Sequence, residues 1–221
     1  MPTPTNMPMT STTSFPSYWE QAKLSLSNAD PIMRGMILNY HGEGLQSRGH
    51  AFHTLARSIV GQQISVKAAD AVWRKFEAVA MQGGNLNPAY VMSLADEQLR
   101  ACGLSGQKVA YMQALSEHFH TQDIHAEDYW LAKADADIIA ELTRIKGIGV
   151  WTAEMFLIFH LMRPDVFPLG DIGLLKAIEK HYAISAKDKK AISAHAEIWR
   201  PYRSVATWYL WRSLDPVVVA Y

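Results

Sequence analysis

The chain has 221 residues, of which 49% are hydrophobic and 19% charged, and its 21 basic residues balance its 21 acidic ones. This length and apolar content suffice for a sizeable core, in one domain or in two closely packed lobes. No apolar run is long enough to span a bilayer, and the N-terminus lacks the charged and apolar regions of a signal peptide. A zero net charge weighs mildly against a nucleic-acid partner without excluding one, because the distribution of charge over the surface matters more than its sum.

Several kinds of chemistry find no support in the sequence. The single cysteine, Cys102, excludes an internal disulfide and fits a reducing compartment, so we expect a cytoplasmic protein. No nucleophile motif surrounds Cys102, which we interpret as a packed thiol. The nine histidines match no zinc-binding spacing, and the chain contains no Walker, G-x-S-x-G or Rossmann motif.

The pattern of apolar residues predicts an all-α fold, because helical spacing recurs along the chain and strand-like alternation is nearly absent. Residues 1–16 are rich in Pro, Ser and Thr without periodicity, and we expect a disordered tail there. Helices are expected over residues 18–27, 31–40, 50–62, 66–81, 95–101, 109–119, 135–144, 151–162, 172–182, 188–198 and 199–211, the last with a break at Pro201.

Two of the expected corners between helices carry polar residues. Gln62 and Gln63 lie between the third and fourth helices, where they form either a solvated turn or a loop that presents a long neutral side chain to DNA. Gly103, Ser105 and Lys108 belong to a glycine turn that opens the helix over 109–119. Backbone N–H groups at such a helix start can bind a phosphate, although this signal alone is weak.

The most informative stretch runs from residue 142 to residue 171. Gly147 and Gly149 form a short glycine hairpin between two helices, which leaves no Cβ in the way of a ligand and directs N–H groups outward. A nearly all-apolar helix follows, and then a loop with Pro168 that ends on Asp171. Taken singly, the glycines more often mark an ordinary turn and the aspartate more often caps a helix.

Together these pieces are more specific. The sequence GIGVWTA over 147–153, followed by an apolar helix and then by Pro168 and Asp171, resembles the helix-hairpin-helix (HhH-GPD) DNA glycosylases, and within them the AlkA-type 3-methyladenine DNA glycosylases. The resemblance covers roughly residues 18–211. It implies two helical lobes with a cleft between them, which we expect at 66–170, hairpin included, and at 17–65 plus 171–221. AlkA itself carries a β-rich domain ahead of the helical part; because only a short tail precedes the first expected helix here, we expect the compact form with two helical lobes.

The resemblance implies a base-excision-repair enzyme that flips out an alkylated purine, of the 3-methyladenine or 7-methylguanine type, and hydrolyses its N-glycosidic bond. Asp171 matches the essential carboxylate, which would stabilise positive charge developing at C1′. Trp151 stands where bifunctional members carry a Schiff-base lysine, so a monofunctional enzyme without lyase activity is implied. Trp151 and Trp211, with Tyr209 or Trp208, would form an aromatic pocket for the cationic base.

The implied partner is double-stranded DNA with a damaged base, bound by a monomer. The expected DNA contacts are Gln62, Gln63, Gly103, Ser105, Lys108, Lys146, Gly147, Gly149 and Thr152, with Gln63 as the side chain that fills the gap in the duplex. The backbone carbonyls of Thr143, Ile145 and Ile148 match those that hold a K+ or Na+ ion in the family. No cofactor is required, and one cysteine excludes a four-cysteine iron–sulfur cluster.

Two alternatives stay open at this point. One is a glycosylase of the same superfamily for another damaged base; Trp151 in place of lysine argues against the bifunctional oxidised-guanine type. The other is a non-catalytic helix-hairpin-helix DNA-binding module, which needs the glycines but not Asp171. Because Gly170 stands where some members have another acid, we expect one candidate carboxylate rather than two.

Overall fold

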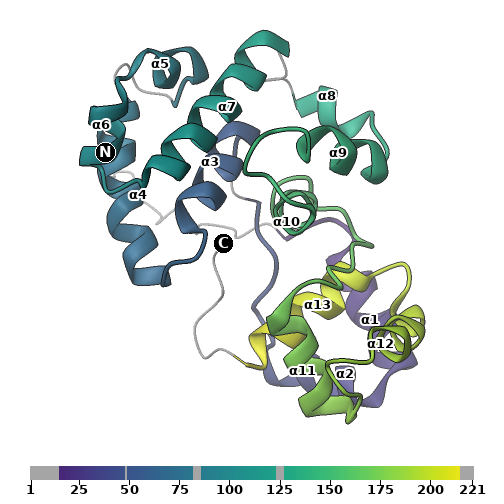
Figure 1. Cartoon of the computed structure of the whole chain (residues 1–221). Helices are drawn as coiled ribbons and strands as arrows, with labels where there is room; N and C mark the ends of the chain where they lie inside the picture. The colour runs from purple at the N-terminus through teal and green to yellow at the C-terminus, as the bar shows by residue number, and fades with distance from the viewer. Residues whose placement is uncertain (1–14, 48, 82–85, 123–126, 215–221) are drawn as a thin grey trace, which may run out of the picture.

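The computed structural model describes residues 15–47, 49–81, 86–122 and 127–214, and every regular element in these ranges is helical (Figure 1). The elements are α1 (Trp19–Ala29), α2 (Pro31–Asn39), α3 (Ala51–Gly61), α4 (Val66–Ala80), α5 (Pro88–Ser93), α6 (Asp96–Ala101), α7 (Gly106–Gln122), α8 (Glu127–Leu131), α9 (Asp135–Leu142), α10 (Val150–Phe159), α11 (Ile172–Tyr182), α12 (Lys189–His195), the 3-10 helix η1 (Ala196–Trp199) and α13 (Arg203–Arg212). The predicted all-α fold is confirmed. None of the described helices combines the length and the hydropathy needed to cross a membrane.

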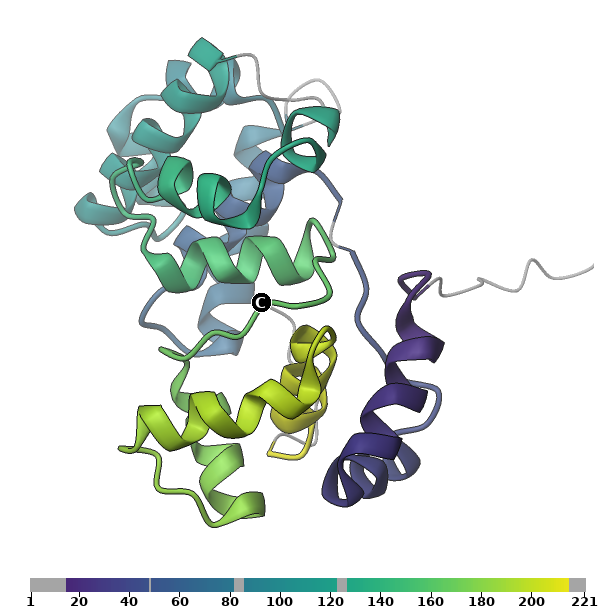
Figure 2. The ribbon, with the colours of Figure 1, turned by 90° about the vertical axis from the view of Figure 1, so that its right-hand side faces the viewer.

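The helices form two lobes (Figures 1 and 2). The hairpin lobe contains α3 to α10, and the terminal lobe contains α1, α2, α11, α12, η1 and α13. Helix α1 packs against α2 and α13, and α11 packs against α13, so the N-terminal helices join the C-terminal ones in one lobe. The chain therefore passes between the lobes twice, once before α3 and once after α10.

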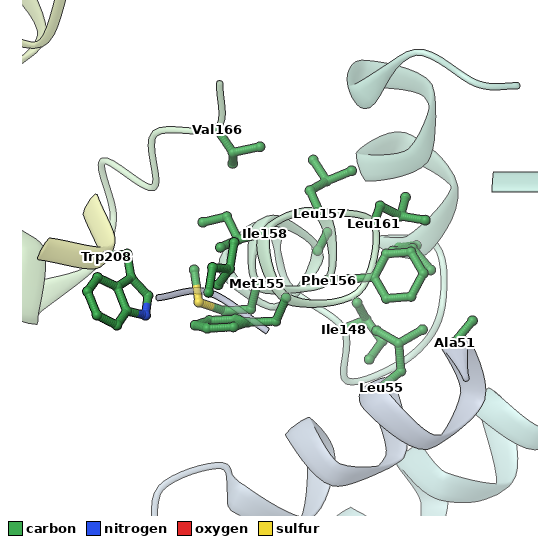
Figure 3. Close-up of a cluster of buried hydrophobic side chains, with 14 of the residues drawn as sticks. Ala51, Leu55, Ile148, Met155, Phe156, Leu157, Ile158, Leu161, Val166 and Trp208 are labelled. Carbon is green, nitrogen blue, oxygen red and sulfur yellow. The ribbon is translucent and has the colours of Figure 1, made fainter. Parts of the chain in front are cut away.

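The predicted lobe boundary at residue 65 is wrong for α3. This helix packs against α4, α7 and α10, and so belongs to the hairpin lobe. The reason is its apolar face, on which Phe52, Leu55 and Ile59 are almost fully buried. Figure 3 shows Leu55 of α3 beside Ile148 and the α10 residue Phe156, with Trp208 of α13 on the opposite side of α10. Helix α10 is thus the central element where the lobes meet.

Local signals in the sequence account for several helix starts. Asp30 accepts hydrogen bonds from the N–H groups of Ile32 and Met33, with Pro31 at the first position of α2. Ser65 caps α4 by accepting from the Ala68 N–H. The chain breaks at Pro201 between η1 and α13, as the sequence predicts.

Two short helices are absent from the prediction. Helix α5 starts with Pro88 after Asn87, whose side chain accepts from the Ala89 N–H, so an Asn cap followed by Pro was the available signal. Helix α8 spans five residues, too few for a periodicity to be recognised. Of the expected disordered tail at 1–16, residues 1–14 lie outside the described residues.

Candidate active site

Asp171 lies at the first turn of α11, at the end of the loop that returns the chain from α10 to the terminal lobe. Its Oδ1 accepts a hydrogen bond from the Leu174 N–H over 2.6 Å, so it is a helix N-cap, as its position before an apolar stripe suggests. The residue is only 6% exposed. Burial of an ionisable group costs free energy unless the group is well hydrogen-bonded.

Two tryptophans supply the further hydrogen bonds. The indole N–H of Trp211, on α13, lies 2.7 Å from Oδ1 of Asp171, and that of Trp151, on α10, lies 2.8 Å from Oδ2. Both carboxylate oxygens are therefore held by N–H donors, three in all with the Leu174 amide. Hydrogen bonds to a charged acceptor are stronger than neutral ones, so this arrangement fixes the orientation of the carboxylate. The donors come from both lobes.

Gly173 leaves room for this arrangement. A Cβ at Gly173 would lie 3.2 Å from Oδ1 of Asp171 and 3.4 Å from Cδ1 of Trp211. The contact with Asp171 is tighter than usual and the contact with Trp211 is at the short end of ordinary packing, so a side chain larger than a methyl group would crowd the carboxylate. This contribution of Gly173 was not anticipated from the sequence.

The aromatic residues proposed for a base pocket separate into two groups. Trp151 and Trp211 both adjoin Asp171, because each donates a hydrogen bond to it. Trp151 is half-buried, whereas Trp211 is only 4% exposed and stacks on Phe159 with 5.8 Å between ring centroids and 13° between planes. Tyr209, in contrast, is fully buried, with its ring stacked on Trp19 and edge-on to Trp208. Tyr209 and Trp208 belong to the core of the terminal lobe, and their assignment to a pocket wall is corrected accordingly.

A second carboxyl group lies near Asp171. Glu154 is on α10, one turn after Trp151, and is half-buried. Burial and the negative charge of Asp171 raise the pKa of Glu154 to about 7. The expectation of a single carboxylate considered only the chain next to Asp171, at Gly170, and overlooked that residues three apart on a helix share a face.

The glycine hairpin between α9 and α10 is tightly built. Gly147 has φ +93°, and a Cβ there would lie 2.2–2.6 Å from ring atoms of Tyr111, so only glycine fits. Gly149 is the N-cap of α10, and a Cβ there would meet nothing within 4 Å. Gln62, expected to face DNA, instead donates its side-chain N–H to the Gly147 carbonyl over 2.9 Å, and so braces the hairpin from α3.

The other residues expected to contact DNA lie in different environments. Lys146 and Gln63 are exposed, and Gln63 has φ +58°. Thr152 is only 4% exposed, within the α10 interior. The Ile145 carbonyl oxygen accepts from the Ile148 N–H over 3.0 Å, which closes the hairpin turn next to Thr143.

The second glycine turn starts α7. Gly103 has φ +101°, and the Ser105 hydroxyl accepts from the Lys108 N–H, which makes Ser105 the cap of α7. The ammonium group of Lys108 donates to the Val60 carbonyl at the end of α3 over 2.7 Å. Burial lowers the pKa of Lys108. Lys108 therefore links α7 to the end of α3, next to the glycine turn at Gly103.

Metal chemistry finds no donor set among the side chains of the described residues, where no group of three or more His, Cys, Asp or Glu converges. The site as described consists of one carboxylate fixed by two tryptophans, a second carboxyl group beside it, and a glycine hairpin at the start of the same helix.

Comparison with known proteins identifies the family. The model of the HhH-GPD superfamily base excision DNA repair proteins matches residues 56–201, more than half of the chain. The chain belongs to the HhH-GPD superfamily. The matched range includes the hairpin, Trp151, Glu154 and Asp171.

Individual members of the HhH-GPD superfamily agree with this assignment. DNA-3-methyladenine glycosylase 1 of Schizosaccharomyces pombe is 30% identical over 87% of this chain and 86% of its own length. The solved structure of S. pombe 3-methyladenine DNA glycosylase in complex with abasic DNA has a TM-score of 0.77 at 29% identity, covering 87% of this chain and 96% of that one. The DNA-3-methyladenine glycosidase of Bacillus halodurans has a TM-score of 0.74 at 34% identity, covering 87% and 88%. The HhH-GPD glycosylase fold is thereby confirmed.

Proposed function

We propose that this HhH-GPD protein is a DNA glycosylase that excises alkylated purines, such as 3-methyladenine and 7-methylguanine, by hydrolysis of the N-glycosidic bond. The observation that carries the proposal is the buried carboxylate of Asp171, held at both oxygens by tryptophan N–H groups from the two lobes. A non-catalytic DNA-binding module would need the hairpin glycines but not a buried, hydrogen-bonded carboxylate. The glycosylase names of the S. pombe and B. halodurans relatives support the same substrate class.

The role proposed for Asp171 is electrostatic. As the glycosidic bond breaks, positive charge develops on the sugar at C1′, and a carboxylate beside it lowers the energy of that transition state. A unit charge pair about 4 Å apart contributes roughly 4 kcal/mol at an effective dielectric constant near 20. Because the hydrogen bonds to Trp151, Trp211 and Leu174 hold the carboxylate in advance, no reorganisation is needed at the moment of reaction.

The proposed substrate class follows from charge. Purines alkylated at N3 or N7 carry a formal positive charge, and an electron-rich ring attracts such a cation by about 0.5–2 kcal/mol. Trp151 is the half-exposed aromatic residue beside Asp171, so it is the ring that we assign to base contact. A cationic base also leaves as a neutral molecule, which makes it a good leaving group.

We further propose that the enzyme is monofunctional. A tryptophan at position 151 cannot form a Schiff base with the sugar, so water is the nucleophile and the DNA strand stays intact. The hairpin residues Lys146, Gly147 and Gly149 are assigned to the DNA backbone, and the exposed Gln63 is assigned to the gap left by the flipped nucleotide. The protein would act as a monomer on DNA in the cytoplasm.

A monovalent cation fits this proposal without being required for it. The backbone carbonyls of Thr143, Ile145 and Ile148 lie along the hairpin turn, and neutral carbonyl oxygens are suitable ligands for K+ or Na+. Such an ion would supply one positive charge for a DNA phosphate at the hairpin.

The decisive experiment compares wild type with Asp171→Asn on a duplex that contains one 7-methylguanine. Wild type should release free 7-methylguanine and leave an abasic site that breaks only on alkali treatment. The Asn variant keeps the size and the N-cap of Asp171 but removes its charge, so base release should fall by at least about 100-fold. Binding to an abasic duplex should persist. Borohydride should trap no covalent adduct with wild type; a trapped adduct would disprove the monofunctional mechanism.

If the Asn variant were as active as wild type, Asp171 would be a helix cap only. If wild type released no alkylated base but did release an oxidised or deaminated one, the substrate class would be wrong and the glycosylase assignment would survive. Binding to the duplex without any base release would favour the binding-module alternative.

A further inference from the structure

Glu154 is a second acidic group in the candidate site whose role the proposed function does not explain. It lies on α10 between buried neighbours, Ala153 and Met155, and is itself half-buried. It follows Trp151 by three positions, which places their Cβ atoms about 5–6 Å apart on one helix face. Because the Trp151 indole contacts Asp171, this face of α10 is the one that meets the essential carboxylate.

No cation in the described residues forms an ion pair with Glu154. Helices α3 and α9 pack against α10. The α3 groups His53 and Arg57 pair with Glu77 and Asp70. The charged groups of α9 are all acidic, namely Asp135, Asp137 and Glu141, so neither helix supplies a cation to Glu154. Asp171 is the charged group that acts on Glu154, and it acts by repulsion. A half-buried glutamate without a cation lowers the stability of the fold, because burial of an unpaired charge costs free energy. Such a residue in a candidate site indicates a chemical role.

The hydrogen bonds of Asp171 limit what that carboxylate can do. A carboxylate oxygen has two lone-pair sites. Oδ1 already accepts from Leu174 and Trp211, and Oδ2 accepts from Trp151. One lone pair on Oδ2 remains. It can be directed at the sugar, but it cannot at the same time accept a proton from water. The reaction needs both functions.

We propose that the two functions are divided, with Glu154 as the general base that takes a proton from the attacking water and Asp171 as the carboxylate that stabilises the sugar cation. This inference rests on the proposed glycosylase function. In the step, the C1′–N bond of the alkylated base breaks and its electron pair goes to the nitrogen, so the cationic base leaves neutral. A water oxygen forms the new bond to C1′, and one water proton moves to the Glu154 carboxylate.

The environment of Glu154 suits this task. A general base works best when its pKa is near the working pH, and burial together with Asp171 brings the pKa of Glu154 to about 7. Its partial exposure gives water access. The two acidic groups thus follow a general pattern, in which neighbouring carboxyl groups in different environments take different protonation roles.

The experiment measures single-turnover release of 7-methylguanine from a duplex between pH 5.5 and pH 8.5, for wild type and Glu154→Gln. The wild-type rate should rise about tenfold per pH unit up to a plateau above pH 7, because the base must be ionised. Glu154→Gln should lose about 100-fold in rate on the plateau and show a flat profile, so that the two proteins converge at low pH. Glu154→Asp should restore part of the activity and the rising limb.

Glu117→Gln is the matched control, because Glu117 is an exposed glutamate on α7. Its rate and pH profile should equal those of wild type. The thermal midpoint of Glu154→Gln should be at least that of wild type, because Gln removes a half-buried charge. Its affinity for an abasic duplex should be unchanged, which separates a chemical defect from a folding defect. If Glu154→Gln does not fold, Glu154→Asp with a shifted rising limb carries the same information.

Two outcomes would overturn the inference. Glu154→Gln with the wild-type rate and profile, while Asp171→Asn is inactive, would remove Glu154 from the chemistry and leave the proposed function intact. A wild-type rate that falls as the pH rises through 7, with this fall lost in Glu154→Gln, would make Glu154 an acid instead of a base. Failure of the proposed function is distinguished by wild type itself, which would then release no alkylated base at any pH.

Discussion

The indole N–H of Trp151 lies 2.8 Å from Oδ2 of Asp171, although the two residues are 20 positions apart and belong to different lobes. Trp211 makes the matching contact to Oδ1 from α13. The carboxylate is therefore clamped where α10, α11 and α13 meet. Trp151 stands where bifunctional members of the family carry a lysine, and it also positions the carboxylate. This positioning role can be tested by mutation.

Replacement of Trp151 by Phe keeps an aromatic ring and removes the N–H donor. A hydrogen bond to a charged group contributes about 1.5–3 kcal/mol, so base release should slow by about 10- to 100-fold. The measurement is the single-turnover rate on a 7-methylguanine duplex, with affinity for an abasic duplex as the control that should change little. An unchanged rate would show that Trp211 and Leu174 alone hold the carboxylate.

Substitution at the two hairpin glycines should separate folding from DNA contact. Gly147→Ala introduces a Cβ at φ +93° against the Tyr111 ring, so it should lower the free energy of unfolding by about 2–4 kcal/mol. Gly149→Ala is the matched variant, because its Cβ meets no atom within 4 Å, and its stability in chemical denaturation should equal that of wild type. Equal losses for the two variants would contradict this account of the hairpin.

Asp30 should make stability depend on pH. Burial alone would raise the pKa of Asp30, but hydrogen bonds from Tyr182, Trp199 and the α2 backbone outweigh it and hold the pKa below its usual value. The ionised form therefore stabilises the fold fully above about pH 4, and this stabilisation disappears as the pH falls below that value through the folded-state pKa.

Asp30→Asn should accordingly lower the free energy of unfolding by about 2–4 kcal/mol at pH 7, because two buried donors lose a charged acceptor. Urea titrations from pH 7 to pH 2.5 should show the difference from wild type shrinking below pH 4. A difference that stays constant down to pH 2.5 would mean that the charge of Asp30 contributes nothing.

Lys146 should contribute to DNA binding through charge. It is exposed in the hairpin, and one phosphate contact changes the slope of log K against log salt by about 0.9. Lys146→Ala should reduce the slope by about one, measured by fluorescence anisotropy on an abasic duplex at several salt concentrations. Lys187→Ala is the control, since Lys187 is exposed just before α12, and its slope should match wild type. Equal slopes for all three proteins would remove Lys146 from the interface.

The sequence by itself determined all the helices except the short α5 and α8, and much of the family assignment. Helical periodicity and the caps at Asp30, Ser65 and Asp171 are local properties, so residues a few positions apart suffice to predict them. The hairpin glycines and the spacing to Asp171 are also contained in one continuous stretch. For this reason the resemblance to HhH-GPD glycosylases is evident in the sequence alone.

Only the tertiary structure decided which side chains meet. The lobe to which α3 belongs depends on which neighbours cover its apolar face, and the burial of Tyr209 depends on Trp19, 190 positions away in the chain. The contacts of Asp171 with Trp151 and Trp211, and its repulsion of Glu154, arise between separate helices. Such contacts depend on how helices pack, and a one-dimensional pattern of residues does not specify that packing.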